Sequence, residues 1–237
     1  MAPIRGLLLR GLLAGAVAGL STGLLALLLA EPTLEAAIAL EPAGGDELFS
    51  RTVQKAGLVL GLVLVGTAIG ALFGLAYRLI PSDVRARPWY RSLALALGGF
   101  VALYLVPFLR YPATPPGVGD ESTLGDRTAA YLLCIALGVA VTTGAFAATR
   151  ELARRRVPAW QRQGGVAVVA VVVVALAYAL LPSAAPVGDT PADLVWDFRI
   201  RSLALQVVLY AVLGAAFGAL AERAATSAPT RVPAGRA

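Results

Sequence analysis

The sequence predicts an all-α integral membrane protein with six transmembrane helices, and three observations support this fold class. Hydrophobic residues make up 58% of the 237 residues, whereas soluble domains average roughly 45–50%. Charged residues make up only 14%, against a soluble average of about 25%. The third observation is that long apolar segments alternate with charged connections. A soluble fold of this composition could not cover its surface, so lipid is the expected solvent.

Six apolar segments approach the roughly 20 residues that cross a bilayer. Their expected bounds are 8–30, 54–77, 92–109, 129–149, 165–182 and 203–221. The fifth segment is rich in valine, which favours a strand in water, but an unpaired strand is not tolerated in lipid, so a helix is expected there. We expect one polytopic membrane domain over 1–237, with 224–237 as a disordered cytoplasmic tail.

Glycines recur every fourth residue in the first segment, at Gly11, Gly15, Gly19 and Gly23. This spacing places them on one helix face, where a second backbone can approach closely. A cleaved signal peptide is the alternative, because Arg5 and Arg10 precede the apolar run. The segment is longer than a typical signal-peptide core, and a cleaved peptide needs no packing face, so a transmembrane helix is favoured.

Basic residues alternate between successive connections. Fourteen Arg and three acids fall in the two termini and the second and fourth connections, whereas six basic residues and eleven acids fall in the other three. The positive-inside rule therefore predicts that both termini are cytoplasmic. The same distribution explains the net charge of +6 without nucleic acid as a partner. The partner it implies is the lipid bilayer.

Short motifs recur in the three connections that are expected to face outward. Val-Gly-Asp occurs at 118–120 and at 187–189, and Gly45-Asp46 stands in the first connection. Each returning helix ends with a Phe, small residues and an Arg. These matches predict three helical hairpins in direct repeat, related by an axis along the membrane normal. Coincidence in an Ala/Gly/Leu-rich background is the open alternative.

Residues that carry common enzyme chemistry are missing from the sequence. There is no histidine, and Cys134 is the single cysteine. Gly19-Leu20-Ser21-Thr22-Gly23 matches a serine nucleophile pattern, but no histidine base exists to activate the serine, so helix packing is the better interpretation. We predict no catalytic residues, no bound cofactor and no enzyme activity.

Carboxylates in the outward connections could attract a divalent cation, because hard divalent cations are bound by oxygen ligands. For most of these acids, an ordinary solvated loop is the better interpretation. Glu31 differs because it directly follows an apolar run, where an ionisable group is a functional candidate, although Pro32 also marks a helix end. Glu31 and Asp120 are the predicted metal contacts.

Seven further residues are predicted as structural or functional motif positions, where a connection meets a helix or interrupts one. They are Arg51, Gln54, Pro107, Arg127, Asp193, Arg199 and Gln206. An acid and an Arg at such a junction could pair across hairpins. They could instead frame the place where an ion enters. Pairing is favoured for the Arg residues, because a cation path gains nothing from a positive wall.

The connections carry specific motifs that cover nearly the whole chain. They include Ser-Arg-Thr-Val-Gln at 50–54, Leu-Val-Pro-Phe-Leu-Arg-Tyr-Pro at 105–112, Pro-Pro-Gly-Val-Gly-Asp at 115–120, Arg-Thr-Ala-Ala-Tyr at 127–131 and Ala-Asp-Leu-Val-Trp-Asp-Phe-Arg at 192–199. With Ala30-Glu31-Pro32, Ala37-Ile38-Ala39-Leu40-Glu41, Ser202, Leu203 and Gln206, they resemble the CbtA family of bacterial cobalt transporter subunits.

This resemblance implies a multi-pass plasma-membrane subunit for uptake of a divalent metal, with Co²⁺ as the transported ion. It also implies a small second membrane subunit, CbtB-like, with a His-rich end. Relatives carry histidines in the first outward connection, and this chain has none, so metal gathering there would be lost or left to a partner. The alternative function is a structural or assembly subunit without an ion path, favoured by the few polar residues in the helices.

Overall fold

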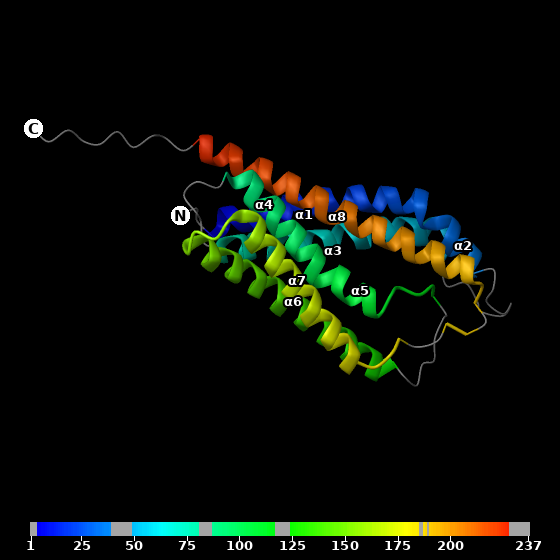
Figure 1. Ribbon diagram of the computed structural model, residues 1–237. Helices are drawn as coiled ribbons and strands as arrows, with labels where there is room; N and C mark the ends of the chain where they lie inside the picture. Colours follow the sequence, from blue (N-terminus) through cyan, green and yellow to red (C-terminus); the bar gives the residue numbers. More distant parts are fainter. Residues whose placement is uncertain are drawn as a thin grey trace, which may run out of the picture. The chain divides into compact units, whose positions relative to one another are not determined.

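The computed structural model describes residues 4–38, 49–80, 87–116, 124–184, 187–188 and 190–227, and every regular element among them is a helix (Figure 1). The elements are α1 (Ile4–Leu29), α2 (Glu31–Ile38), α3 (Arg51–Leu79), α4 (Pro88–Phe100), the π-helix η1 (Val101–Leu105), α5 (Val106–Arg110), α6 (Leu124–Arg154), α7 (Ala159–Leu180) and α8 (Ala192–Thr226). Six helical stretches are long and apolar enough to cross a membrane. The predicted fold class is confirmed.

The helices are longer than the apolar segments that mark them. α8 begins at Ala192, well before the expected start of the sixth segment at 203, so Asp193, Asp197 and Arg199 all lie within this helix. Likewise, α2 forms a short helix within the expected first loop. Hydropathy detects only the apolar part of a helix, whereas the hydrogen-bond ladder continues until something interrupts it. α8 continues to Thr226, and 228–237 of the expected tail lie outside the described residues.

Prolines stand at many of these helix boundaries. Pro88 is the first residue of α4, Pro158 is the N-cap of α7, and Pro182 follows soon after its end. Pro32 is the second residue of α2, and Pro191 directly precedes α8. Proline suits the first turn of a helix, where its missing N–H has no partner to lose, but it disrupts the interior.

The chain divides into two compact units, each described by itself. The first comprises Met1–Leu25, Phe49–Leu97 and Val208–Ala237, and the second comprises Ala26–Leu48 and Gly98–Val207. This division into two units does not test the expected direct repeat of three hairpins, which stays a prediction.

In the first unit, α1 and α3 pack backbone against backbone through their glycines. A Cβ atom on Gly11 would collide with the carbonyl oxygen of Gly70, and one on Gly15 with that of Gly66. A Cβ on Gly19 would meet the carbonyl of Leu62 in the same way. Close approach of this kind is typical of small-residue faces on transmembrane helices.

An aromatic cluster joins α3 to α8 in the same unit. Phe217, whose exposed fraction is 0%, lies with its ring centroid 5.2 Å from that of Phe73 and 4.9 Å from that of Tyr77. Nearby, the buried Ser92 hydroxyl of α4 donates a hydrogen bond of 2.7 Å to the carbonyl of Gly214. The hydroxyl has no water to bond inside a membrane, so this carbonyl satisfies it.

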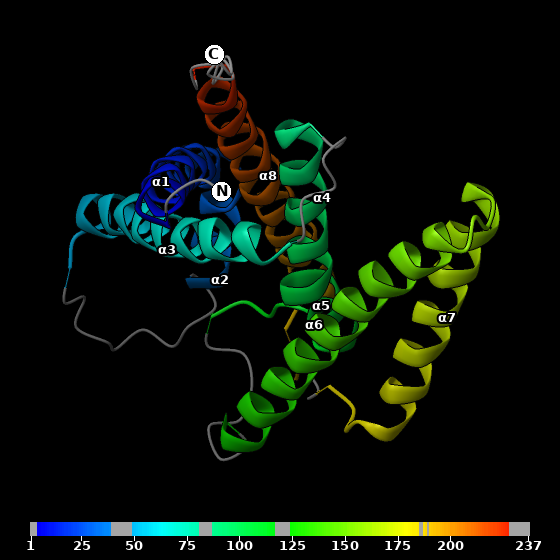
Figure 2. The same cartoon turned by 90° about the vertical axis from the view of Figure 1, so that its left-hand side faces the viewer.

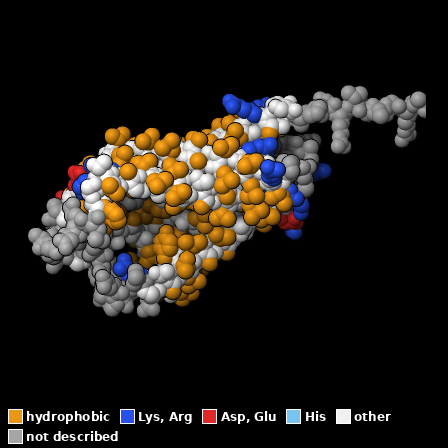
Figure 3. Space-filling model, turned by 180° about the vertical axis from the view of Figure 1, so that it is seen from behind, with side chains coloured by type: hydrophobic (Ala, Val, Ile, Leu, Met, Phe, Trp, Pro, Cys, Tyr) orange, Lys and Arg blue, Asp and Glu red, His pale blue; other side chains and the backbone are white. Residues whose placement is uncertain are grey.

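In the second unit, α6 and α7 form a helical hairpin (Figure 2). α6 also packs on the π-helix, where a Cβ on Gly138 would collide with the backbone of Ala102. No described residue of α7 is buried. Hydrophobic side chains cover most of the described surface on the face drawn in Figure 3, as a lipid-facing protein requires.

Candidate functional site

Arg201 joins two chain segments at the start of α8. Its guanidinium donates a hydrogen bond of 2.7 Å to the carbonyl oxygen of Leu29, the last residue of α1. The same group forms an ion pair of 3.0 Å with Asp197, one helical turn away. Carbonyls at a helix C-terminus lack intrahelical partners and carry partial negative charge, so a guanidinium is a favourable cap.

Two more arginines bind backbone carbonyls in the same way. The Arg199 Nε donates to the carbonyl of Ala113 across 3.3 Å. Arg110 donates to the carbonyls of Leu181 and Pro182, the latter at 2.6 Å, just beyond the end of α7. Arg199 was expected to pair with an acid of another hairpin, whereas its described hydrogen bond is to the backbone. These arginines therefore bind backbone carbonyls just beyond the ends of α5 and α7.

A hollow of about 330 Å³ lies between α2 and the start of α8. Its lining residues are Pro32, Thr33, Ala36, Pro191, Asp193, Leu194, Asp197 and Arg201. Asp193 and Asp197 are one turn apart on α8, so both carboxylates stand at the same wall. The Thr33 side chain is only 3% exposed, and its hydroxyl has no hydrogen-bond partner among the described residues. The hollow thus gathers two carboxylates and the guanidinium of Arg201, whereas the Thr33 hydroxyl is buried behind its wall.

Glu31, the first predicted metal contact, is the first residue of α2 and is 7% exposed. The first turn of α2, which contains Glu31, is closed by hydrogen bonds from the Thr33 and Leu34 amides to the Ala30 carbonyl. An acid in the first turn of a helix is stabilised by the helix dipole. Asp120, the second predicted contact, lies outside the described residues. Within the described part of the chain, no group of three or more Asp, Glu, Cys or His could hold a metal ion.

In the second unit, two tyrosine hydroxyls lie at the π-helix and at the residue that follows it. The Tyr178 hydroxyl of α7 donates to the carbonyl of Val106, beside the buried Pro107. The Tyr104 hydroxyl is buried and has no hydrogen-bond partner among the described residues. Its ring stacks on Phe108 with centroids 5.3 Å apart. π-Helices often occur at functional sites, and the extra residue here comes just before the proline.

The remaining predicted motif residues lie in several helices. Arg51 donates to the side-chain oxygen of Gln54 at 2.5 Å, and Gln54 donates to the carbonyl of Phe49 at 3.0 Å. These bonds are local to the start of α3. Arg127 lies half-buried in α6, and Gln206 lies half-buried in α8.

Sequence reasoning did not select Arg201, Arg110 or Thr33 as site residues. The four-residue spacing of Asp197 and Arg201 was a usable signal, since such pairs share a helix face. Arg110 directly precedes a tyrosine and a proline at a helix end, which also indicated a capping role. Nothing in the sequence distinguished Thr33, because its burial depends on how α2 packs.

A family comparison identifies the chain. The model of the CbtA family, described as probable cobalt transporter subunits, matches residues 4–222. The chain belongs to the CbtA family. No curated protein and no solved structure shows a significant match to it.

As a CbtA protein with six helices that can span a membrane, the chain is a multi-pass membrane subunit of a cobalt transporter. CbtA is a transporter family and not an enzyme family. As a subunit of a transporter, the chain works with partners. The resemblance stated from the connection motifs is therefore confirmed.

Proposed function

We propose that this subunit admits Co²⁺ from outside the cell, and that the ion enters at the hollow between α2 and α8. The observation that carries the proposal is the pair of carboxylates, Asp193 and Asp197, on the wall of that hollow. Carboxylates attract hydrated divalent cations. Arg201 pairs with Asp197, and no ion pair of the described residues engages Asp193. Asp193 is the stronger candidate of the two.

A first contact for a transported ion must be weak enough to release it. Two carboxylates, one of them paired with Arg201, are too few to replace the hydration shell of a divalent ion, which favours a transient contact with a hydrated ion. Glu31 and Asp120 remain proposed metal contacts on the same side of the membrane. No cofactor is proposed.

The proposed orientation places both termini in the cytoplasm of a bacterial cell and the hollow outside the plasma membrane. It rests on the excess of arginine in the termini and in the second and fourth connections. A small CbtB-like membrane subunit is the proposed partner. Because this chain has no histidine, histidine-based capture of the metal would fall to that partner.

A structural subunit without its own ion path is the second candidate function. The backbone contact between α1 and α3 favours it, because glycines packed so closely leave no room for an ion between these helices. It predicts that loss of this chain lowers the amount of the partner subunit.

Metal uptake separates the two candidates. Cells with and without this chain would be compared for Co²⁺ accumulation, together with cells that carry Asp193→Asn at matched amounts of protein. Transport through this chain predicts that uptake falls in the variant while the partner subunit is present at its normal level. The structural function would be established if the Asp193→Asn variant takes up Co²⁺ normally and the partner subunit is lost from cells without this chain.

A further inference from the structure

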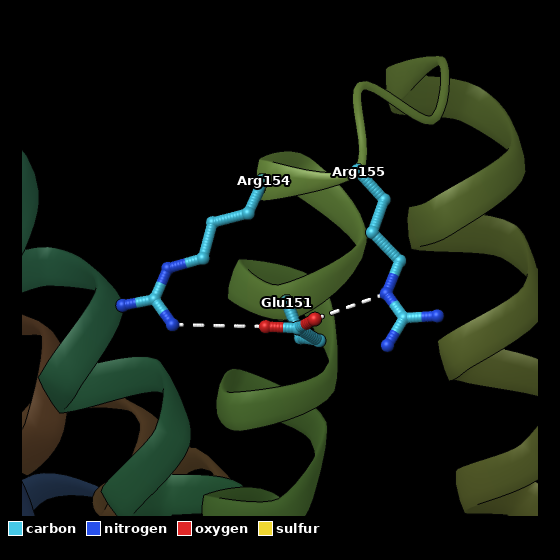
Figure 4. A network of polar contacts seen from close by, with 3 residues as sticks. All are labelled: Glu151, Arg154 and Arg155. Atoms are coloured by element: carbon cyan, nitrogen blue, oxygen red, sulfur yellow. Dashed lines mark hydrogen bonds and ion pairs between the residues drawn. The ribbon is translucent and has the colours of Figure 1, made fainter.

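Arginines gather around the turn between α6 and α7. Figure 4 shows Glu151 between Arg154, at 3.6 Å, and Arg155, at 2.9 Å, with the two arginine side chains on opposite sides of it. The five basic residues around the turn are Arg150, Arg154, Arg155, Arg156 and Arg162. The segment 150–162 therefore carries five positive charges and one carboxylate, so the turn is strongly cationic.

The backbone of this turn holds an arginine where glycine is usual. The Arg156 amide bonds to the Ala153 carbonyl at 3.1 Å, and the Val157 amide bonds to the Leu152 carbonyl at 3.0 Å. These two bonds define a Schellman motif, in which the residue at the position of Arg156 is left-handed and most often glycine. Arg156 has φ 58°. The cationic side chain is thus present despite a steric cost that glycine would avoid.

An apolar groove of about 460 Å³ runs between α6 and α7 from this turn. Its lining is entirely apolar or glycine, with Leu152 and Gly165 near the turn and Val141 and Val173 farthest from it. From Leu152 to Val141 the groove is about 16 Å long at 1.5 Å per residue. This length is close to one leaflet, which is half of a hydrocarbon core of about 30 Å.

We propose that the groove and the arginine turn bind one anionic phospholipid, with an acyl chain in the groove and the phosphate on the arginines. An apolar tail joined to a negative head matches an apolar groove that ends at a cationic turn. The length of the groove favours a lipid, because a transmembrane helix of a partner would need a face that continues through both leaflets. This lipid site is independent of the proposed ion contact.

The experiment uses the purified full-length protein in detergent, incubated with phosphatidylglycerol or phosphatidylcholine and analysed by native mass spectrometry. We expect selective retention of phosphatidylglycerol. An arginine near a lipid surface contributes roughly fivefold to binding, so Arg155→Gln with Arg156→Gln should reduce retention roughly thirtyfold. Arg223→Gln, at the other end of the chain, should retain the lipid as the parent does.

Two further variants separate lipid binding from folding. Arg156→Gly removes a charge but suits the left-handed backbone, so it should weaken phosphatidylglycerol retention roughly fivefold without lowering the thermal midpoint. Gly144→Leu should block the groove, whereas Gly57→Leu should not alter retention. Both glycines have open space at the Cβ position, so neither substitution should unfold the protein.

Three results would overturn the proposal. They are equal retention of both lipids, displacement of phosphatidylglycerol by inorganic phosphate at similar concentration, and cross-linking of groove residues to a helix of another protein. The first would mean that the arginines do not select the head, the second that only an anion binds, and the third that protein covers the groove.

Discussion

Arg201 in α8 donates a hydrogen bond of 2.7 Å to the carbonyl oxygen of Leu29, which lies 172 residues earlier in the chain. The bond ties the end of α1 to the start of α8, at the position where α2 and α8 border the proposed ion contact. Arg201 is therefore a positioning residue for the hollow, and Asp197 holds its guanidinium in place.

Replacement of Arg201 should destabilise the protein. Arg201→Gln removes a charged donor, and hydrogen bonds to charged groups contribute about 1.5–3 kcal/mol. The thermal unfolding midpoint in detergent would show the loss. Arg155→Gln is the control, because the Arg155 side chain is 70% exposed and an exposed site changes stability by about 0.5 kcal/mol or less. Equal midpoints for both variants would contradict the role of Arg201.

Replacement of Gly15 should disrupt the α1–α3 contact. Gly15→Leu places a side chain against the backbone of Gly66, and overpacking should cost about 3 kcal/mol or more. Membrane accumulation and the thermal midpoint would both fall. Gly57→Leu, on the open side of α3, should accumulate like the parent. Normal accumulation of Gly15→Leu would show that the two helices can separate without loss.

Loss of the Tyr178 hydroxyl should weaken the second unit. Tyr178→Phe leaves the Val106 carbonyl without this donor, and we expect a loss of about 1 kcal/mol. Tyr90→Phe is a matched control, because Tyr90 is exposed. An unchanged midpoint for Tyr178→Phe would mean that the carbonyl is satisfied in another way.

Substitution of the proposed metal contacts should reduce Co²⁺ uptake at matched protein levels. Glu31→Gln and Asp120→Asn are expected to reduce it strongly. The controls are Glu41→Gln and Glu47→Gln, acids of the first connection for which a solvated surface is the better interpretation. If all four variants transport alike, the acidic connections only solvate the protein surface.

The proposed topology predicts the location of three connections. Reporters fused after residues 40, 118 and 190 should be extracytoplasmic, because arginine is retained on the cytoplasmic side. An enzyme that is active only outside the cytoplasm would report each position. A cytoplasmic signal at any of the three would overturn the six-helix orientation.

The membrane fold could be predicted because lipid imposes simple rules on sequence. Apolar runs revealed the six helices, and the four-residue glycine spacing identified the face of α1 that meets α3. The ends of the helices could not be predicted in the same way. α8 extends through Asp193 and Asp197 because polar residues at the lipid boundary do not interrupt a hydrogen-bond ladder.

The candidate site was predictable only in part, because backbone carbonyls leave no trace in side-chain patterns. Arg199 and Arg201 were visible as charged residues beside a membrane segment, but their acceptors are the carbonyls of Ala113 and Leu29. Thr33 carries no sequence signal at all, since only the packing of α2 buries it. Pairing rules based on opposite side-chain charges therefore missed these contacts.

Because of the π-helix at Val101–Leu105, the directions of the side chains after it depend on the number of residues in this segment as well as on their types. The π-helical turn contains one residue more than an α-helical turn. That extra residue rotates every later residue by about 100° around the helix axis. A helical wheel that starts at Gly98 and assumes unbroken α-helix therefore assigns Arg110 to the wrong side. Homologous segments aligned without allowance for that residue would exchange lipid-facing and protein-facing positions, and a single deletion there would redirect Arg110 away from the end of α7.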